Sequence, residues 1–121
     1  MTQEEKDLLL KDLCGRLPYG TMVECSIGNA AMDVVLHSAH IDEFIEQMLI
    51  VKPYLRPMSS MTEEEKAEFM WLEDKCAKMP TYEYVAVETY RVFDWLNAHH
   101  FDYRGLIEKG LAIETTEETY G

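Results

Sequence analysis

The fold is decided by residues 21–37, TMVECSIGNAAMDVVLH. Apolar and polar side chains alternate from Val23 to Ile27, which is typical of a strand with one buried face. Gly28-Asn29 predicts a tight turn, because both residues tolerate the left-handed backbone of short hairpin turns. Ala30 to His37 then predicts the return strand, so the stretch as a whole predicts a β-hairpin.

The residues before this hairpin predict a helix. Thr2 and Glu5 have the spacing of a capping box, in which each side chain accepts a hydrogen bond from the other residue's backbone N–H. Leucines at helical spacing follow, so we expect a helix over about residues 3–14. Gly15 is placed to end it, because glycine readily adopts the left-handed conformation that follows many helices.

A second capping box begins at Thr62 and closes at Glu65. The glutamates at positions 63–65 favour the positive end of the helix dipole, and Met79-Pro80 is expected to end this helix. Another helix is expected over about Glu83 to Ala98. It is apolar on nearly every side near Val92, which predicts the most buried helix of the chain, with these residues inward: Val85, Val92, Phe93 and Leu96.

Residues 41–55 fit both a short helix and a third strand, and we expect one of them to lead into an extended segment from Pro53 to Pro57. Residues 114–121 are acidic and are expected to fray. The fold class predicted from these segments is α+β, in one domain over residues 1–121. It has an N-terminal helix, a small antiparallel sheet, and two further helices and an irregular C-terminal segment packed on one sheet face.

Composition and charge exclude several classes of function. The chain has 121 residues, is 47% hydrophobic and carries a formal net charge of −12, so it can bury a core yet has no basic surface for nucleic acid or anionic lipid. The glutamates between positions 63 and 74 predict a solvated helix face rather than a mimic of nucleic acid. Three cysteines (Cys14, Cys25 and Cys76) without a CxxC motif predict small buried thiols in a reducing compartment. With no leader-like or membrane-spanning segment, a soluble cytoplasmic protein is expected.

Two groups of side chains are candidates for chemistry. His37 and His40, which are followed by two acids, have side chains of the kind that bind zinc. An HxxH pair needs a helix to place both imidazoles on one face, whereas a strand end is predicted there. His99 and His100 with Asp102 are candidates for an acid–base dyad, and Cys76 is a candidate nucleophile. Because adjacent residues on a helix point about 100° apart, the two histidines are not expected to share one site. No cofactor, resident metal or catalytic residue is therefore predicted.

Two segments resemble a known group of proteins. KPYLRPMSSMTEEE (residues 52–65) and DWLNAHHFDYRGLI (residues 94–107) are similar to small uncharacterised proteins of Bacteroides-type gut bacteria and their phages. The opening, Thr2 to Gly20, resembles the start of the same family, whereas residues 21–51 do not. The resemblance implies a phage or mobile-element origin and favours a binding function, but it transfers no functional residue.

One combination of side chains joins aromatic and basic groups in this acidic chain. Such groups anchor protein interfaces or hold anions, although they also pair with surplus carboxylates inside a protein. The predicted binding residues are Tyr54, Arg56, Trp95, Tyr103 and Arg104. The expected function is that of a non-catalytic accessory protein that binds, and inhibits, a host protein with a basic surface. The alternatives are a protein that sequesters a small anionic ligand and a small metal-dependent enzyme, and a homo-oligomer is compatible with all three.

Overall fold

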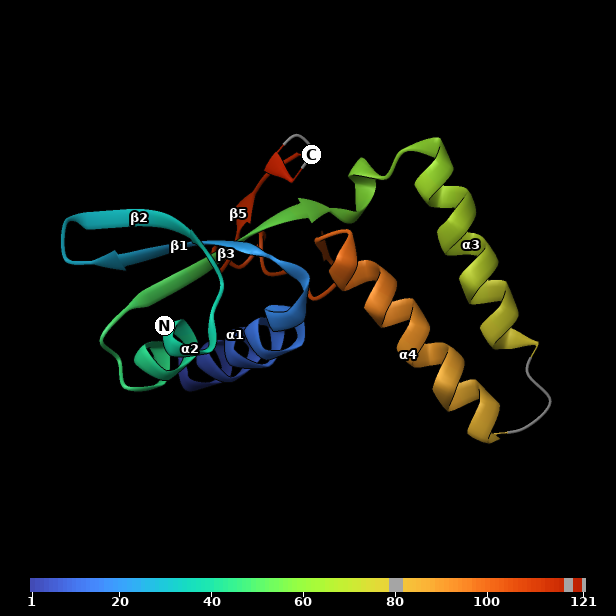
Figure 1. Ribbon diagram of the computed structural model, residues 1–121, viewed down its shortest axis with the longest axis horizontal. Coiled ribbons are helices and arrows are strands. Elements are labelled where there is room, and N and C mark those ends of the chain that lie inside the picture. Colours follow the sequence, from blue (N-terminus) through green and yellow to red (C-terminus); the bar gives the residue numbers. More distant parts are fainter. Residues whose placement is uncertain (79–81, 117–118, 121) are drawn as a thin grey trace.

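The computed structural model of the protein describes residues 1–78, 82–116 and 119–120, with no account of the side chains of residues 82–88. Its helices and strands are shown in Figure 1. They are α1 (Gln3–Arg16), β1 (Met22–Ile27), β2 (Ala30–Val35), α2 (Ser38–Ile45), β3 (Ile50–Pro57), α3 (Glu63–Ala77), α4 (Tyr82–Ala98), β4 (Phe101–Asp102) and β5 (Ile113–Glu114). Single 3₁₀ turns, η1 (Leu17–Tyr19) and η2 (Met58–Ser60), follow α1 and β3.

The α+β fold class is confirmed, and so is the hairpin. The sheet order is β2-β1-β3-β4, with β5 also paired to β3. β1 is antiparallel to both β2 and β3, whereas the two-residue strands β4 and β5 run parallel to β3. Residue Ile27 pairs with Ala30 across the turn, where Gly28 has a φ of 56°. Such a φ favours glycine over residues with a Cβ atom.

Helix α1 begins with the predicted capping box, since Thr2 and Glu5 exchange side-chain and backbone hydrogen bonds. It ends at Arg16, two residues later than expected. Gly15 is helical, and the left-handed glycine is Gly20, with a φ of 66° after the η1 turn. The glycine rule for helix ends predicted an end at about residue 14. The helix continues to Arg16 because this side chain forms a buried ion pair with Asp12.

The core lies between α1, α2 and the sheet, and α1 and α2 share one side of the sheet in Figure 1. Three elements supply fully buried side chains: Leu13 of α1, Val23 of β1 and Val51 of β3. The C-terminal segment adds Leu106 and Leu111 to the same cluster. Residues 106–112 therefore complete a core that begins at residue 9.

The ambiguous residues 41–55 form both predicted structures in turn. α2 continues through Ile45, and β3 begins at Ile50. A turn separates them, in which Gln47 has a left-handed φ of 62°. Pro53 and Pro57 both lie in β3, as the extended geometry around proline predicts.

Helices α3 and α4 differ from the expected packing on a sheet face. They pack against each other and project from the end of the sheet where β3 stops (Figure 1), and we call these two helices the arm. α3 begins with the predicted capping box at Thr62 and has no buried residue. The predicted end at Met79-Pro80 lies outside the described residues. Because α1 and α2 already cover one face of the sheet, the arm buries apolar surface between its own two helices and, at its base, against α1 and β4.

The described side chains of α4, residues 89–98, do not fit the prediction that it is the most buried helix. Phe93 is 43% exposed and Tyr90 is 72% exposed, and Leu96 is the one buried apolar residue among the described side chains of α4. Val92 is half-buried, and the prediction for Val85 lies outside the described side chains. A helix that is apolar on all sides is fully buried only if it is surrounded, and α4 is not.

The described residues of the expected frayed tail have partners. The Thr115 backbone N–H donates to the Leu55 carbonyl at 2.8 Å. The Tyr120 hydroxyl donates to the Tyr54 carbonyl at 2.5 Å and accepts from the Met22 backbone N–H at 3.1 Å. An aromatic residue with these two backbone contacts holds the end of the chain against the sheet.

No disulfide joins the three cysteines, and they are not all buried as predicted. Cys14 is exposed, while Cys25 and Cys76 are half-buried. Burial raises the pKa of the Cys25 thiol, which keeps it protonated at neutral pH.

Candidate functional site

A cleft lies where the arm joins the sheet, and we call it the helix-junction cleft. It has a volume of about 970 Å³. Residues from β3, from the start of α3, from the end of α4 and from the C-terminal tail line it: Arg56, Thr62, Glu63, Glu64, Glu65, Glu68, Ala98, His99, His100 and Tyr120. It therefore combines carboxylates with imidazoles and one guanidinium.

Arg56 and Glu65 form the centre of the cleft wall. Both terminal nitrogens of Arg56 donate to Glu65, at 2.7 and 2.8 Å, and its guanidinium lies 4.2 Å from the centre of the Phe101 ring. The capping box places Glu65 here, because the same carboxylate accepts from the Thr62 backbone N–H. The Arg56 hydrogen bonds lower the pKa of Glu65 to about 2. The charge of Arg56 is thus matched by a carboxylate within the protein.

An aromatic column stands beside this pair. The Trp95 ring lies 4.3 Å from His99, 5.6 Å from Phe69 and 5.8 Å from Phe101, measured between ring centres. The Trp95 indole N–H donates to Glu68 at 2.9 Å. His99 Nδ1 lies 3.3 Å from a Glu65 oxygen. These contacts fix α4 against α3 at the base of the arm.

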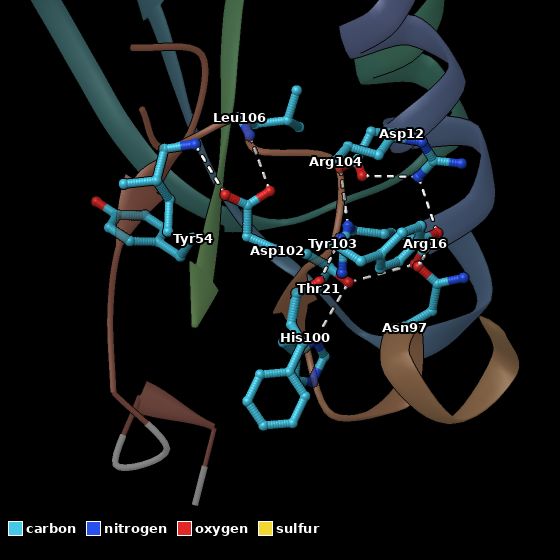
Figure 2. Close-up of polar contacts among 12 residues, drawn as sticks. Asp12, Arg16, Thr21, Tyr54, Asn97, His100, Asp102, Tyr103, Arg104 and Leu106 are labelled. Atoms are coloured by element: carbon cyan, nitrogen blue, oxygen red, sulfur yellow. Dashed lines mark hydrogen bonds and ion pairs between the residues drawn. The ribbon is translucent and has the colours of Figure 1, made fainter. Parts of the chain in front are cut away.

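His100 follows α4 with a left-handed φ of 63°, a position where glycine or asparagine is usual. Its Nδ1 contacts the Thr21 hydroxyl (Figure 2) at a distance of 3.3 Å, and its ring stacks on Tyr120 with 3.5 Å between ring centres. Burial, followed by electrostatic interaction with Arg16, His99 and Arg56, lowers the pKa of His100 to about 4. The imidazole is therefore neutral at neutral pH.

The structure does not assemble the acid–base dyad considered from the sequence. Asp102 accepts hydrogen bonds from the Leu106 and Ile107 backbone N–H groups, at 2.9 Å each, so its carboxylate holds a loop. Cys76 contacts Thr89 within the arm, and it lies eleven residues beyond Glu65 on α3, which is roughly 16 Å along the helix axis.

A second polar cluster is buried between α1 and the C-terminal segment (Figure 2). Asp12 accepts from Arg16 Nε at 2.8 Å and from Arg104 Nη1 at 2.9 Å. Arg16 also donates to the Phe101 carbonyl at 2.7 Å, and Arg104 donates to the Tyr103 hydroxyl at 2.8 Å. The Asp12 and Arg16 side chains have no exposed surface, so the cluster ties residues far apart in the chain.

The five predicted binding residues do not form one patch. Arg56 lines the helix-junction cleft, and Trp95 packs on His99 beside it. Tyr103 and Arg104 belong to the buried cluster around Asp12. Tyr54 lies on β3, where its hydroxyl donates to Asp33 at 2.6 Å and the pKa of Tyr54 rises to about 12. The alternative stated from the sequence, that basic side chains pair with surplus carboxylates inside the protein, describes Arg56 and Arg104.

The two histidines proposed as weak metal ligands lie at the start of α2. His37 precedes the helix, and its backbone N–H donates to His40 Nδ1 at 3.0 Å. The predicted strand end is therefore a helix start. Within the described part of the chain, no three histidine, cysteine or acidic side chains converge as metal ligands do, and this holds for the acids that follow His40.

A groove that the sequence did not reveal runs between the hairpin and α2, and we call it the hairpin groove. It has a volume of about 380 Å³ and is lined by Cys25, Ile27, Ala30, Ala31, Met32, Val34, Ala39, His40, Glu43 and Leu49. Ile27 is 63% exposed and Met32 is 66% exposed. Alternation in the hairpin correctly gave one apolar face, but α2 covers only part of that face, and no local pattern predicts where a helix stops covering a sheet.

Comparison with known proteins adds no relative. No family model matches the chain, and neither a curated protein nor a solved structure is significantly similar to it. Of the helices in the described residues, none combines the length and apolar character needed to cross a membrane.

Proposed function

We propose that this chain is a non-catalytic binding protein that holds a partner protein at the hairpin groove. The observation that carries the proposal is the exposure of large apolar side chains beside an edge strand. Ile27 and Met32 project into the groove with more than half of their surface exposed. A binding protein whose partner is absent has such a surface, whereas an isolated enzyme has no need of it.

The edge strand β2 supports this proposal. β2 is the last strand on its side of the sheet, and its six residues contain no proline and no lysine. Natural edge strands are usually protected by such residues, by a bulge or by a covering segment. Asp33 is the one charged residue of β2, and its carboxylate accepts from Tyr54 on the open sheet face. An extended segment of a partner therefore has a backbone edge to pair with and an apolar groove beside it.

Charge indicates the chemistry of the partner. Glu43 lines the groove, Asp42 is its neighbour on α2, and the whole chain has a net charge of −12. We infer a partner segment that alternates apolar residues with lysine or arginine. The resemblance to phage-associated proteins makes a bacterial host protein the first partner to seek, with inhibition as the expected result of binding. Three cysteines without a disulfide fit an encounter in the reducing cytoplasm.

The two alternatives have less support. An anion-sequestering protein needs cationic groups facing a ligand, but Arg56 and Arg104 each bond a carboxylate. A metal-dependent enzyme needs converging ligands, and none converge in the residues that the structure covers. No contact or cleft among the described residues specifically supports either alternative function.

The test is affinity capture from a lysate of the bacterial host with two matched variants. Met32→Glu places a charge in the groove, and Met70→Glu makes the same change on α3, where Met70 is 67% exposed. We expect the protein and Met70→Glu to retain one partner in a salt-sensitive manner, and Met32→Glu to lose it. Retention by both variants would exclude the groove. Self-association at rising concentration, lost in Met32→Glu, would instead identify a second copy as the occupant.

A further inference from the structure

One ring nitrogen of His100 has no partner within the described residues. The Thr21 hydroxyl lies 3.4 Å from the Arg16 carbonyl and 3.3 Å from His100 Nδ1. A hydroxyl has one proton, and a carbonyl only accepts, so both contacts are hydrogen bonds at once only if Nδ1 carries a proton and donates to Thr21. Nε2 then carries a lone pair.

That lone pair faces the helix-junction cleft. His100 lines the cleft although only 7% of its surface is exposed, and Tyr120 covers one face of its ring. In Figure 2 the second ring nitrogen lies on the side of the imidazole away from Thr21. Nε2 of His100 is not one of the fully buried side-chain atoms that lack a hydrogen-bond partner in the described residues, so it still reaches solvent. A nearly buried acceptor of this kind calls for a donor from outside the chain.

Acidic side chains outnumber basic ones among the residues that line the cleft. Four glutamates line the cleft against one arginine, Arg56, which Glu65 already binds with both oxygens. Glu63 lies 3.4 Å from Lys66, and Glu68 accepts from Trp95. Glu64 makes no hydrogen bond or ion pair with the described residues. The cleft thus offers a neutral imidazole acceptor and at least one carboxylate without a cation beside it.

We propose that the helix-junction cleft binds a guanidinium group, from an arginine side chain or a small guanidino compound. A guanidinium has N–H donors spread around a plane, so one group donates to His100 Nε2 and to a cleft carboxylate together. An anion is repelled by the glutamates. A metal ion lacks three converging ligands among the residues described. This site shares no lining residue with the hairpin groove. A test of guanidinium binding can therefore fail or succeed independently of the proposed partner binding at the groove.

The experiment is a titration of the ¹⁵N-histidine-labelled protein with N-acetylarginine amide, followed through the His100 ring nitrogens. The free protein should show the Nδ1–H tautomer, and the ligand should shift Nε2 saturably, with a dissociation constant of about 1 mM. Glu64→Gln should weaken binding about fivefold because it removes a carboxylate from the cleft. Glu73→Gln, the same change on the exposed part of α3 outside the cleft, should leave the dissociation constant unchanged.

Parallel titrations with other ligands test whether the site prefers guanidinium to ammonium, and whether the guanidinium comes from a protein or from a small compound. N-acetyllysine amide should bind more weakly than the arginine compound, and an arginine-containing peptide that binds more tightly than free guanidinium would identify a protein ligand. His100→Asn keeps a residue that tolerates the left-handed backbone and should abolish binding. An Nε2–H tautomer in the free protein, or no saturable shift of Nε2, would overturn the proposal even if His100→Asn failed to fold.

Discussion

Helices α1 and α3 begin with the same device but end in different surroundings. Each starts with a threonine–glutamate capping box, at Thr2 and at Thr62, and each has acidic residues in its first turn. α1 buries Leu9 and Leu13 completely, whereas α3 buries nothing. The comparison teaches that capping sets where a helix starts, while tertiary packing decides how much the helix contributes to the stability of the protein.

Two ion pairs at the same helical spacing test this contrast most strongly. Asp12 and Arg16 form a fully buried pair in α1, and Asp74 and Lys78 form an exposed pair near the end of α3. Asp12→Asn should lower the free energy of unfolding by about 3–5 kcal/mol, since it leaves buried guanidinium groups uncompensated. Asp74→Asn should change it within error in urea unfolding. Equal effects would refute the distinction between the helices.

Two leucines give the next comparison. Leu13→Ala opens a cavity in the core and should cost about 3–4 kcal/mol, because neighbouring side chains of the sheet cannot close on it. Leu72→Ala on half-buried α3 should cost about 1 kcal/mol. Urea midpoints of both variants measure the difference. A cost for Leu72→Ala as large as that for Leu13→Ala would mean that the arm and the sheet region share one core.

Acid should weaken the junction between the two regions. The pKa of His100 is about 4 in the folded protein, against an ordinary value of 6.5, so the unfolded chain binds the extra proton between these pH values. Stability should therefore fall by about 2 kcal/mol as pH drops from 6.5 towards 4. The groups around the imidazole that set this window are Thr21, Tyr120, Arg16, Arg56 and His99.

Unfolding measured across this pH range in the protein and in His100→Asn checks the assignment. The variant should show a flatter profile between pH 4 and 6.5, because it has no imidazole to titrate at this position. Below that window both proteins should lose stability, since Glu65, with a pKa of about 2, is protonated more easily when unfolded. Identical slopes above pH 4 would show that another group is responsible.

Hydrogen exchange should reveal the smallest difference. Amide protons of α3 should exchange at least about tenfold faster than those in the middle of α1, because the arm opens without disturbing the buried leucines. Native-state exchange followed by NMR measures this ratio at individual residues. Equal protection would indicate that the arm and the sheet region unfold as one unit.

Local signals in the sequence predicted the local parts of the structure. The hairpin turn at Gly28, both capping boxes and the extended prolines of β3 depend on neighbours within a few residues. The exposure of Phe93 was missed because periodicity shows which residues share a face but not what covers that face.

The candidate sites were harder to predict for the same reason. Asp12 and Arg104 pair across 92 positions, and the Thr21 hydroxyl meets His100 across 79. Their residue types were visible, but no spacing in the sequence connects them. Arg56 and Glu65 lie only nine positions apart, yet their contact depends on the η2 turn between them.

The docking of residues 106–112 beside α1 has a consequence for synthesis. Ribosomes release the N-terminal residues first, so Leu9 and Leu13 emerge long before Leu106 and Leu111 exist to cover them. During that interval the apolar side of α1 is open to chaperones or to other nascent chains. Folding to the final state waits for residues 106–112, and its rate should depend on closing that long loop rather than on forming α1.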